Sequence, residues 1–195
     1  MQRKMLDRIT SWVGLALALL LIVAASLLTW GHNFISHEVS TQLSAQQIFF
    51  PPKGSPATAG PEFAQMRQYA GQQLTTGAQA EVYADHFIAV HLKEAGGGKT
   101  YAQLSTLAQA DPSNNKLAAQ VATMFKGETL RGLLLNAYAF GTAATIAGIA
   151  AIVGFVAAGL LLLLSALGLW HSHRMPPTPQ TELGDPRDRV PAAVG

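Results

Sequence analysis

The sequence of 195 residues contains no cysteine and few charged residues, which make up only 12% of the chain. Without cysteine the chain forms no disulfide framework, and thiol catalysis, thiolate-bound zinc and iron–sulfur clusters are excluded. The charges that remain are nearly balanced, because 13 basic and 11 acidic residues leave a net charge of +2. This balance lacks the concentrated positive surface of a nucleic-acid-binding protein, so we expect no nucleic-acid partner.

Apolar side chains are in excess: they form 49% of the chain and give it a mean hydropathy of +0.23. The longest apolar stretches are two blocks, residues 9–30 and 133–170, which carry no Asp, Glu, Lys or Arg. A helix needs about 20 apolar residues to cross the roughly 30 Å hydrocarbon core of a bilayer, and both blocks are long enough. The sequence therefore predicts an all-α membrane protein with two transmembrane helices, and the lipid bilayer as its first partner.

The first block has two alternative interpretations. Trp12 and Trp30 lie near its ends, where indole rings favour the two membrane interfaces, as in a transmembrane helix at residues 9–30. A cleaved signal peptide would have a shorter apolar stretch of about 7–15 residues, followed by an A-x-A-like site. Here Ala16-Leu17-Ala18 lies inside the apolar stretch. We therefore favour an uncleaved signal anchor.

The second block, residues 133–170, is longer than a membrane requires. As one helix its 38 residues would extend about 57 Å, so we expect residues 145–170 to be embedded and the earlier part to emerge from the bilayer. Glycines recur through it at positions 141, 148, 154 and 159. Such a small-residue face allows close helix packing, against the first span or against a second copy, and we favour the first span.

Orientation follows from the positions of Lys and Arg near the span ends. Arg3, Lys4 and Arg8 precede the first span and Arg174 follows the second, whereas residues 31–47 contain no Lys or Arg. Only Lys126 and Arg131 oppose this trend. We expect a multi-pass protein of the cell membrane with both termini cytoplasmic.

This orientation divides the chain into five regions. Residues 1–8 form a cytoplasmic N-terminus, and residues 31–132 form a small α-helical extracytoplasmic domain between the spans. Residues 171–195, with five prolines after Met175 and no apolar face, are expected to be a disordered cytoplasmic tail.

Within the extracytoplasmic domain, apolar periodicity predicts helices over residues 32–47, 62–73, 78–95 and 100–110, and from about 113 into the second span. The consecutive prolines at 51 and 52 and the glycines at 96–98 should end helices. Thr100 and Gln103 have the spacing of a capping box. We expect Asp111 to be the N-cap of the last helix, with Pro112 in its first turn.

No motif in this domain specifies a reaction. The segment Gly96–Thr100 resembles the end of a phosphate-binding loop, but Lys93 stands where that motif requires a glycine. His86 and His91 are five residues apart, which places them about 140° apart around an α-helix and disfavours a shared metal. We therefore predict no metal, no cofactor and no catalytic residue, and lean towards a non-enzymatic protein.

The polar residues of the domain are the candidates for interaction with a partner. They are Tyr83, Asp85, His86, His91, Lys99, Tyr101, Glu128 and Arg131. Glu128 and Arg131 are three residues apart on one helical face and should pair. We also expect Leu130, Leu133 and Leu134 to pack against the helices of the domain.

Five stretches resemble an uncharacterised family of actinobacterial two-span membrane proteins, over about residues 10–174. They are Ala45–Pro52, Tyr69–Gln73, Tyr83–His91, Gly97–Ala102 and Gly127–Ala139. The resemblance implies a bacterial cell membrane and no established activity. We expect the domain to contact another membrane protein, a second copy of the chain or the envelope. The alternative is an envelope-facing hydrolase or ligand-binding protein that uses the polar residues between 83 and 101.

Overall fold

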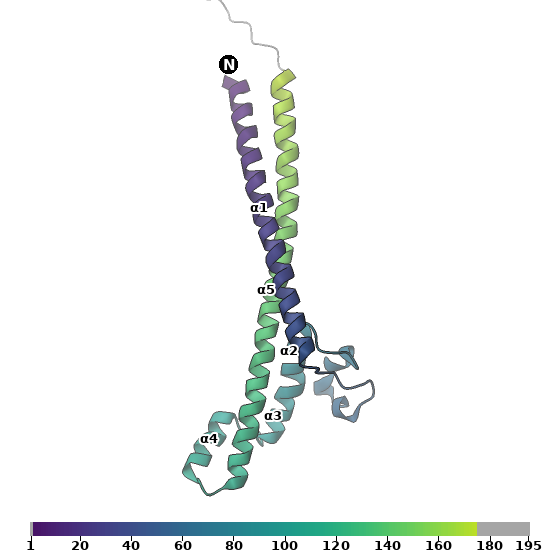
Figure 1. Ribbon diagram of the computed structural model, residues 1–195, viewed down its shortest axis with the longest axis vertical. Coiled ribbons are helices and arrows are strands. Elements are labelled where there is room, and N and C mark those ends of the chain that lie inside the picture. Colours follow the sequence, from purple (N-terminus) through teal and green to yellow (C-terminus); the bar gives the residue numbers. More distant parts are fainter. Residues whose placement is uncertain (1, 175–195) are drawn as a thin grey trace, which may run out of the picture. The chain divides into compact units, whose positions relative to one another are not determined.

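The computed structural model describes residues 2–174 and, from Met5 onwards, their side chains. The described chain is helical and has no strand (Figure 1), apart from an isolated bridge between Phe49 and Gln73. Its elements are α1 (Gln2–Ala45), the 3₁₀ turns η1 (Pro56–Thr58), η2 (Pro61–Phe63) and η3 (Met66–Tyr69), α2 (Gly77–Tyr83), the π-helical turn η4 (Ala84–Ile88), α3 (Ala89–Ala95), α4 (Tyr101–Ala110) and α5 (Asn115–Arg174). The predicted all-α class is confirmed, as are two helices long and apolar enough to cross a membrane.

The chain separates into two compact units. The terminal unit consists of residues 1–22 and 155–195, and the central unit consists of residues 23–154. Helices α1 and α5 contribute to both units, while every shorter element belongs to the central one.

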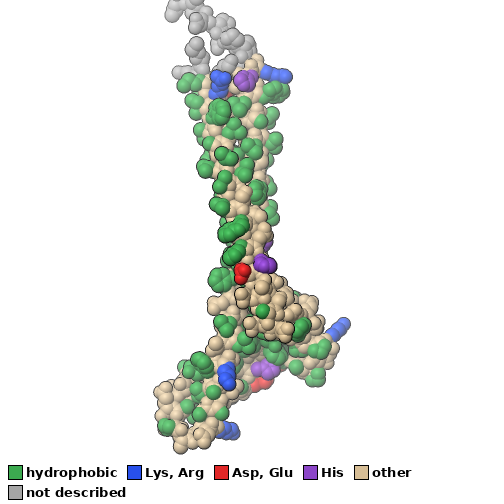
Figure 2. Space-filling model, in the orientation of Figure 1, with side chains coloured by type: hydrophobic (Ala, Val, Ile, Leu, Met, Phe, Trp, Pro, Cys, Tyr) green, Lys and Arg blue, Asp and Glu red, His purple; other side chains and the backbone are tan. Residues whose placement is uncertain are grey.

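In the terminal unit, α1 and α5 pack closely because the residues between them are small. Ser11, Ala18, Ala158 and Ser165 are all at most 5% exposed. A Cβ on Gly14 would collide with the hydroxyl of Ser165, so only glycine fits there without a shift. The large apolar side chains of both helices point outwards instead, and cover the surface shown in green in Figure 2.

In the central unit, the two helices are also joined by a polar contact. The Nδ1 atom of His32 lies 2.7 Å from the carbonyl oxygen of Ala144 and donates its hydrogen to it. A Cβ at position 148 would lie 2.9 Å from that Nδ1 atom, so Gly148 makes room for the imidazole. Packing of the glycine face against α1 is thus confirmed at Gly148, whereas Gly141 contacts Gly77 of α2.

The buried small residues on both helices follow a seven-residue spacing. They are Ser11, Ala18 and Ala25 on α1, and Ala144, Ala151, Ala158, Ser165 and Ser172 on α5. A repeat of seven keeps one face of a helix turned to its partner, as in coiled coils. The contact surface is therefore an alanine and serine repeat; of the predicted glycines, Gly148 faces α1, whereas a Cβ on Gly159 would meet open space.

Helix α1 continues past the predicted span to Ala45, so the helical extension predicted over residues 32–47 is confirmed as far as residue 45. It ends before Pro51 and Pro52, as predicted, and Gln47 takes a positive φ of 51°. The next segment returns alongside this turn: the N–H of Phe50 donates to Gln72 and the N–H of Leu74 donates to Ile48.

The predicted helix over residues 62–73 was wrong. The segment contains only the 3₁₀ turns η2 and η3, and Gly71 has a φ of +75° that no α-helix accommodates. Its last residues form hydrogen bonds with residues 48–50, so their backbone groups are unavailable for an α-helical ladder.

The predicted helix over residues 78–95 is present but is interrupted by η4, a single π-helical turn. Thr76 and Gln79 form a capping box at its start that the sequence analysis missed. The glycines at 96–98 end the helix, and the predicted capping box of Thr100 and Gln103 begins α4.

The predicted N-cap of α5 was wrong by three residues. Asn114 caps the helix, because its side-chain oxygen accepts a hydrogen bond of 3.0 Å from the N–H of Leu117. Asp111 instead accepts hydrogen bonds from the side chains of Ser113 and Asn114. Its carboxylate is therefore occupied within the turn that precedes α5.

At its other end α5 extends to Arg174, so the prediction that a disordered tail begins at residue 171 was wrong for residues 171–174. The guanidinium of Arg174 lies over the ring of Trp170, 4.2 Å from its centroid, and stabilises this last turn. The remainder of the predicted tail, residues 175–195, lies outside the described residues.

The central unit has one apolar core between its short helices and α5. Its buried members include Phe50, Met66, Leu74 and Leu134. The predicted packing of Leu134 is therefore confirmed. For Leu130 and Leu133 the prediction was wrong, because their side chains are 40% and 61% exposed.

Candidate functional site

Three of the predicted interaction residues meet where η4 faces α5. The Nη2 atom of Arg131 lies 2.7 Å from Oδ1 of Asp85, and its Nη1 atom lies 3.8 Å from Oε2 of Glu128. The predicted contact between Glu128 and Arg131 is thus present. Asp85 joins it from 46 residues earlier in the chain, a contact that spacing does not reveal. The guanidinium of Arg131 therefore pairs with two carboxylates, and its pair with Asp85 links η4 to α5.

Two other predicted residues, Tyr83 and His91, lie in a row of aromatic rings. The ring of Tyr83 lies 5.4 Å from Phe50 and 4.9 Å from Phe87, and His91 lies 4.3 Å from Phe87. Nδ1 of His91 also donates to the carbonyl of Phe87 over 2.7 Å. Burial raises the pKa of the Tyr83 hydroxyl. Both side chains therefore contribute to packing.

The remaining predicted residues are spread over the unit. Lys99 lines a hollow of about 180 Å³ together with Glu128 and Arg131. Tyr101 packs on Phe125, with ring centroids 5.8 Å apart, and His86 is half-buried on η4. The structure thus brings Lys99 to the same hollow as Glu128 and Arg131, while the rings of Tyr83 and Tyr101 pack against phenylalanines. The hydrolase alternative stays a prediction.

No three His, Asp or Glu side chains of residues 5–174 lie close enough together to hold a metal ion. His86 and His91 belong to consecutive elements, η4 and α3, and Nδ1 of His91 is engaged by the carbonyl of Phe87 in η4.

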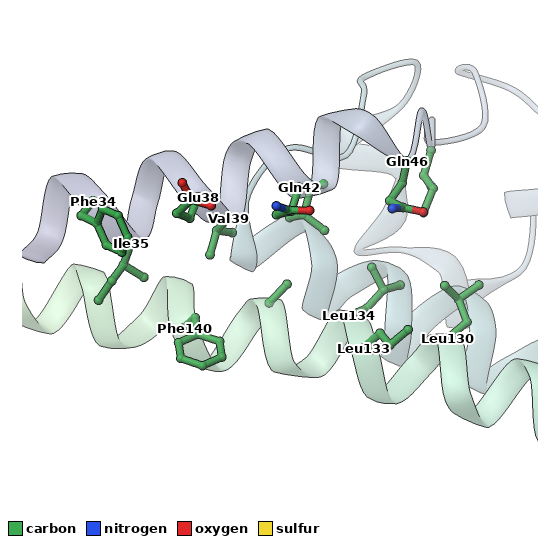
Figure 3. A pocket seen from close by; sticks show the side chains of 13 residues that line it. Phe34, Ile35, Glu38, Val39, Gln42, Gln46, Leu130, Leu133, Leu134 and Phe140 are labelled. Carbon is green, nitrogen blue, oxygen red and sulfur yellow. The ribbon is translucent and has the colours of Figure 1, made fainter.

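A larger surface feature is an apolar groove between the outer part of α1 and α5, within the central unit (Figure 3). Its volume is about 480 Å³, within the range of about 300–1,000 Å³ that is usual for ligand sites. Side chains from both helices line it: Phe34, Ile35, Glu38, Val39, Gln42 and Leu43 of α1, Gln46 and Ile48 just after it, and Leu130, Leu133, Leu134, Ala137 and Phe140 of α5.

The groove exposes large apolar side chains beside a polar edge. Phe34 is 54% exposed, and Leu133 and Phe140 are each 61% exposed. The polar edge comes from α1 and the residue that follows it, where Glu38, Gln42 and Gln46 are spaced four residues apart (Figure 3). A contiguous apolar surface with a polar rim is typical of a binding site.

The sequence analysis missed this groove, although a signal for it was present. Phe34 and Ile35 belong to the apolar residues that predict the helix over residues 32–47. A different face of α1, the one that carries His32, packs against α5. A helix with apolar residues beyond the face that its partner covers has a second apolar surface, and here that surface forms the groove.

Comparison with protein-family models, with curated proteins and with solved structures gives no match. The resemblance to actinobacterial two-span proteins therefore stays a prediction, and the function is argued from the geometry of the chain.

Proposed function

We propose that this chain is a non-enzymatic, two-span protein of the cell membrane that binds another membrane protein through the groove between α1 and α5. Both termini are cytoplasmic in this proposal, and residues 31–132, within the central unit, form the extracytoplasmic domain. The observation that carries the proposal is the groove itself, with large apolar side chains exposed beside a polar edge.

The surface of the long helices supports a membrane location. On α1 the exposed apolar residues include Leu20, Val23 and Leu27, and on α5 they include Ile152 and Leu163. Leaving so much apolar surface in water would be costly, whereas a bilayer matches it. The helix pair can therefore hold itself together by its small residues while its outer surface contacts lipid.

The position of the groove favours a partner that is itself in the membrane. Phe34 lies four residues beyond Trp30, or about 6 Å along the helix, and Gln46 lies sixteen residues beyond it, or about 24 Å. If Trp30 marks the interface, the groove begins at the membrane surface and runs outwards. A helix that leaves the bilayer beside α1 would place its apolar face in the groove and its polar face towards Glu38 and the glutamines.

Site-specific photo-crosslinking tests this proposal in intact cells. The photoreactive residue p-benzoylphenylalanine replaces Phe140 in the groove, and Phe125 as a matched control. Both are exposed phenylalanines of α5, with exposed fractions of 61% and 57%. We expect a discrete crosslinked product from position 140 and none of that size from position 125.

Mass spectrometry of the product identifies the partner. A second membrane protein supports the proposal, and a product of two copies of the chain would replace it with self-association. Identical products from both positions, or none from position 140 at normal abundance of the protein, would contradict groove binding.

A further inference from the structure

A second pocket of the central unit has a different character, because hydroxyl groups line it. Its volume is about 380 Å³, and it lies between α1, the residues that lead into α2, and α5. Ser36 and Ser40 of α1 line it together with Tyr138 and Thr142 of α5. Thr75, Thr76 and Thr145 complete a set of seven hydroxyls.

Three of these hydroxyls are already used within the protein. Thr145 donates to the carbonyl of Gly141 over 2.9 Å, Thr75 lies 3.3 Å from Oε1 of Gln79, and Thr76 accepts from the N–H of Gln79. The other four, on Ser36, Ser40, Tyr138 and Thr142, make no hydrogen bond with the described part of the chain. They are available as both donors and acceptors to a molecule in the pocket.

The lining of the pocket carries no charge. None of its twelve described residues is Lys, Arg, His, Asp or Glu. A phosphate or carboxylate would therefore lose water here without gaining a counter-charge, which is unfavourable. A neutral group with several hydroxyls would exchange its bonds to water for bonds to the four available side chains.

If Trp30 marks the edge of the hydrocarbon core, the pocket lies just beyond the headgroup layer of a bilayer. Ser36 and Ser40 lie six and ten residues beyond Trp30, or about 9 and 15 Å along the helix. The polar layer on each side of the hydrocarbon core is about 5–8 Å thick. Ser36 and Ser40 are thus out of reach of a small headgroup, but within reach of a headgroup of two sugar rings that projects beyond this layer.

From this geometry we infer that the hydroxyl pocket binds the neutral, polyhydroxylated headgroup of a membrane glycolipid. The inference rests on the membrane location proposed above, but it does not depend on the protein partner or on which side of the membrane the central unit faces. The groove is a separate surface that shares only Val39 with this pocket.

Lipid retention by the full chain tests the inference. The protein is reconstituted in phosphatidylcholine nanodiscs that contain equal amounts of diglucosyl diacylglycerol and phosphatidylglycerol, and native mass spectrometry measures which lipid stays bound after release. We expect selective retention of the glycolipid. Tyr138→Phe removes one hydroxyl and should lower retention about two- to tenfold, the range for one hydrogen bond.

A matched pair of double variants separates the pocket from general effects of hydroxyl loss. Ser36→Ala with Ser40→Ala should nearly abolish retention, whereas Thr123→Ala with Thr129→Ala should not change it. The two threonines lie on α5 outside the pocket and donate to carbonyls of their own helix. Hydrogen exchange of the central unit shows whether either pair disturbs the fold.

Three outcomes would overturn the inference. They are equal retention of all three lipids, preference for phosphatidylglycerol, and glycolipid retention that survives in the Ser36 and Ser40 double variant. A further arm adds free maltose: displacement of the glycolipid by maltose at equal concentration would show that a soluble sugar, not a lipid, is the ligand. Failure of the crosslinking experiment would leave all these outcomes unaffected.

Discussion

Replacement of Leu134 should weaken the central unit far more than the same replacement at its neighbour Leu133. Leu134 is 3% exposed and belongs to the apolar core, while Leu133 is 61% exposed at the edge of the groove. Truncation of Leu134 to alanine loses about 1.5–3 kcal/mol of apolar transfer energy, and the cavity left behind raises the cost to about 2–5 kcal/mol. Because less than half of Leu133 is covered, its truncation should cost about 1 kcal/mol.

Hydrogen exchange in nanodiscs measures this difference. If the amides of α3 and α4 exchange through opening of the core, a loss of 2–5 kcal/mol in Leu134→Ala speeds their exchange about 30- to 4,000-fold, at 1.4 kcal/mol for each factor of ten. Leu133→Ala should speed it less than about tenfold. If both variants exchange alike, or Leu134→Ala exchanges at the rate of the parent, the assignment of Leu134 to the core is wrong.

Three further predictions concern topology, ionisation and packing. Cysteine in place of exposed Lys53 should react with an impermeant thiol reagent in intact cells, and cysteine in place of exposed His173 only after permeabilisation; the reverse pattern would invert the topology. Burial raises the pKa of Tyr83, so its stabilising effect is complete below the unfolded value of about 10 and is lost as pH rises through the folded value. Chemical denaturation above about pH 10 should therefore show a smaller loss of stability in Tyr83→Phe than in the parent, and an equal loss would refute the role of this hydroxyl. Gly141→Val should cost about 1–3 kcal/mol in the same assay, because a Cβ there lies 3.1 Å from the backbone of α2, while Gly132→Ala, with open space around it, should be neutral or stabilising.

The parts of the fold that the sequence predicted are those decided by local chemistry. Hydropathy predicted both long helices, and the spacing of Thr100 and Gln103 predicted a cap that the structure contains. The segment 62–73 has comparable helical composition, yet its backbone bonds with residues 48–50 prevail. Helix propensity alone does not predict the structure of a segment whose backbone groups can form hydrogen bonds with distant residues.

The site was harder to predict because its parts come from distant positions. Asp85 and Arg131 were each selected as polar candidates, but nothing in their spacing pairs residues that are 46 positions apart. The groove depends on which face of α1 is covered by α5, and the sequence identifies that face only in part. Ser11, Ala18 and Ala25 recur every seven residues in the sequence, whereas the prediction placed the helix contact at the glycines of the second span.

A seven-residue repeat of small residues does not by itself determine how α5 is aligned along α1. If α5 slid by one repeat along α1, alanines and serines would again meet small residues, and the apolar contacts alone would hardly distinguish the two arrangements. His32 removes this ambiguity, because its ring requires a position without a side chain, as at Gly148. Seven residues to one side α5 carries Phe155, which offers no such space, and seven to the other it carries Gly141, which already contacts Gly77. His32 therefore selects one alignment of α5 along α1 from those that the seven-residue repeat allows.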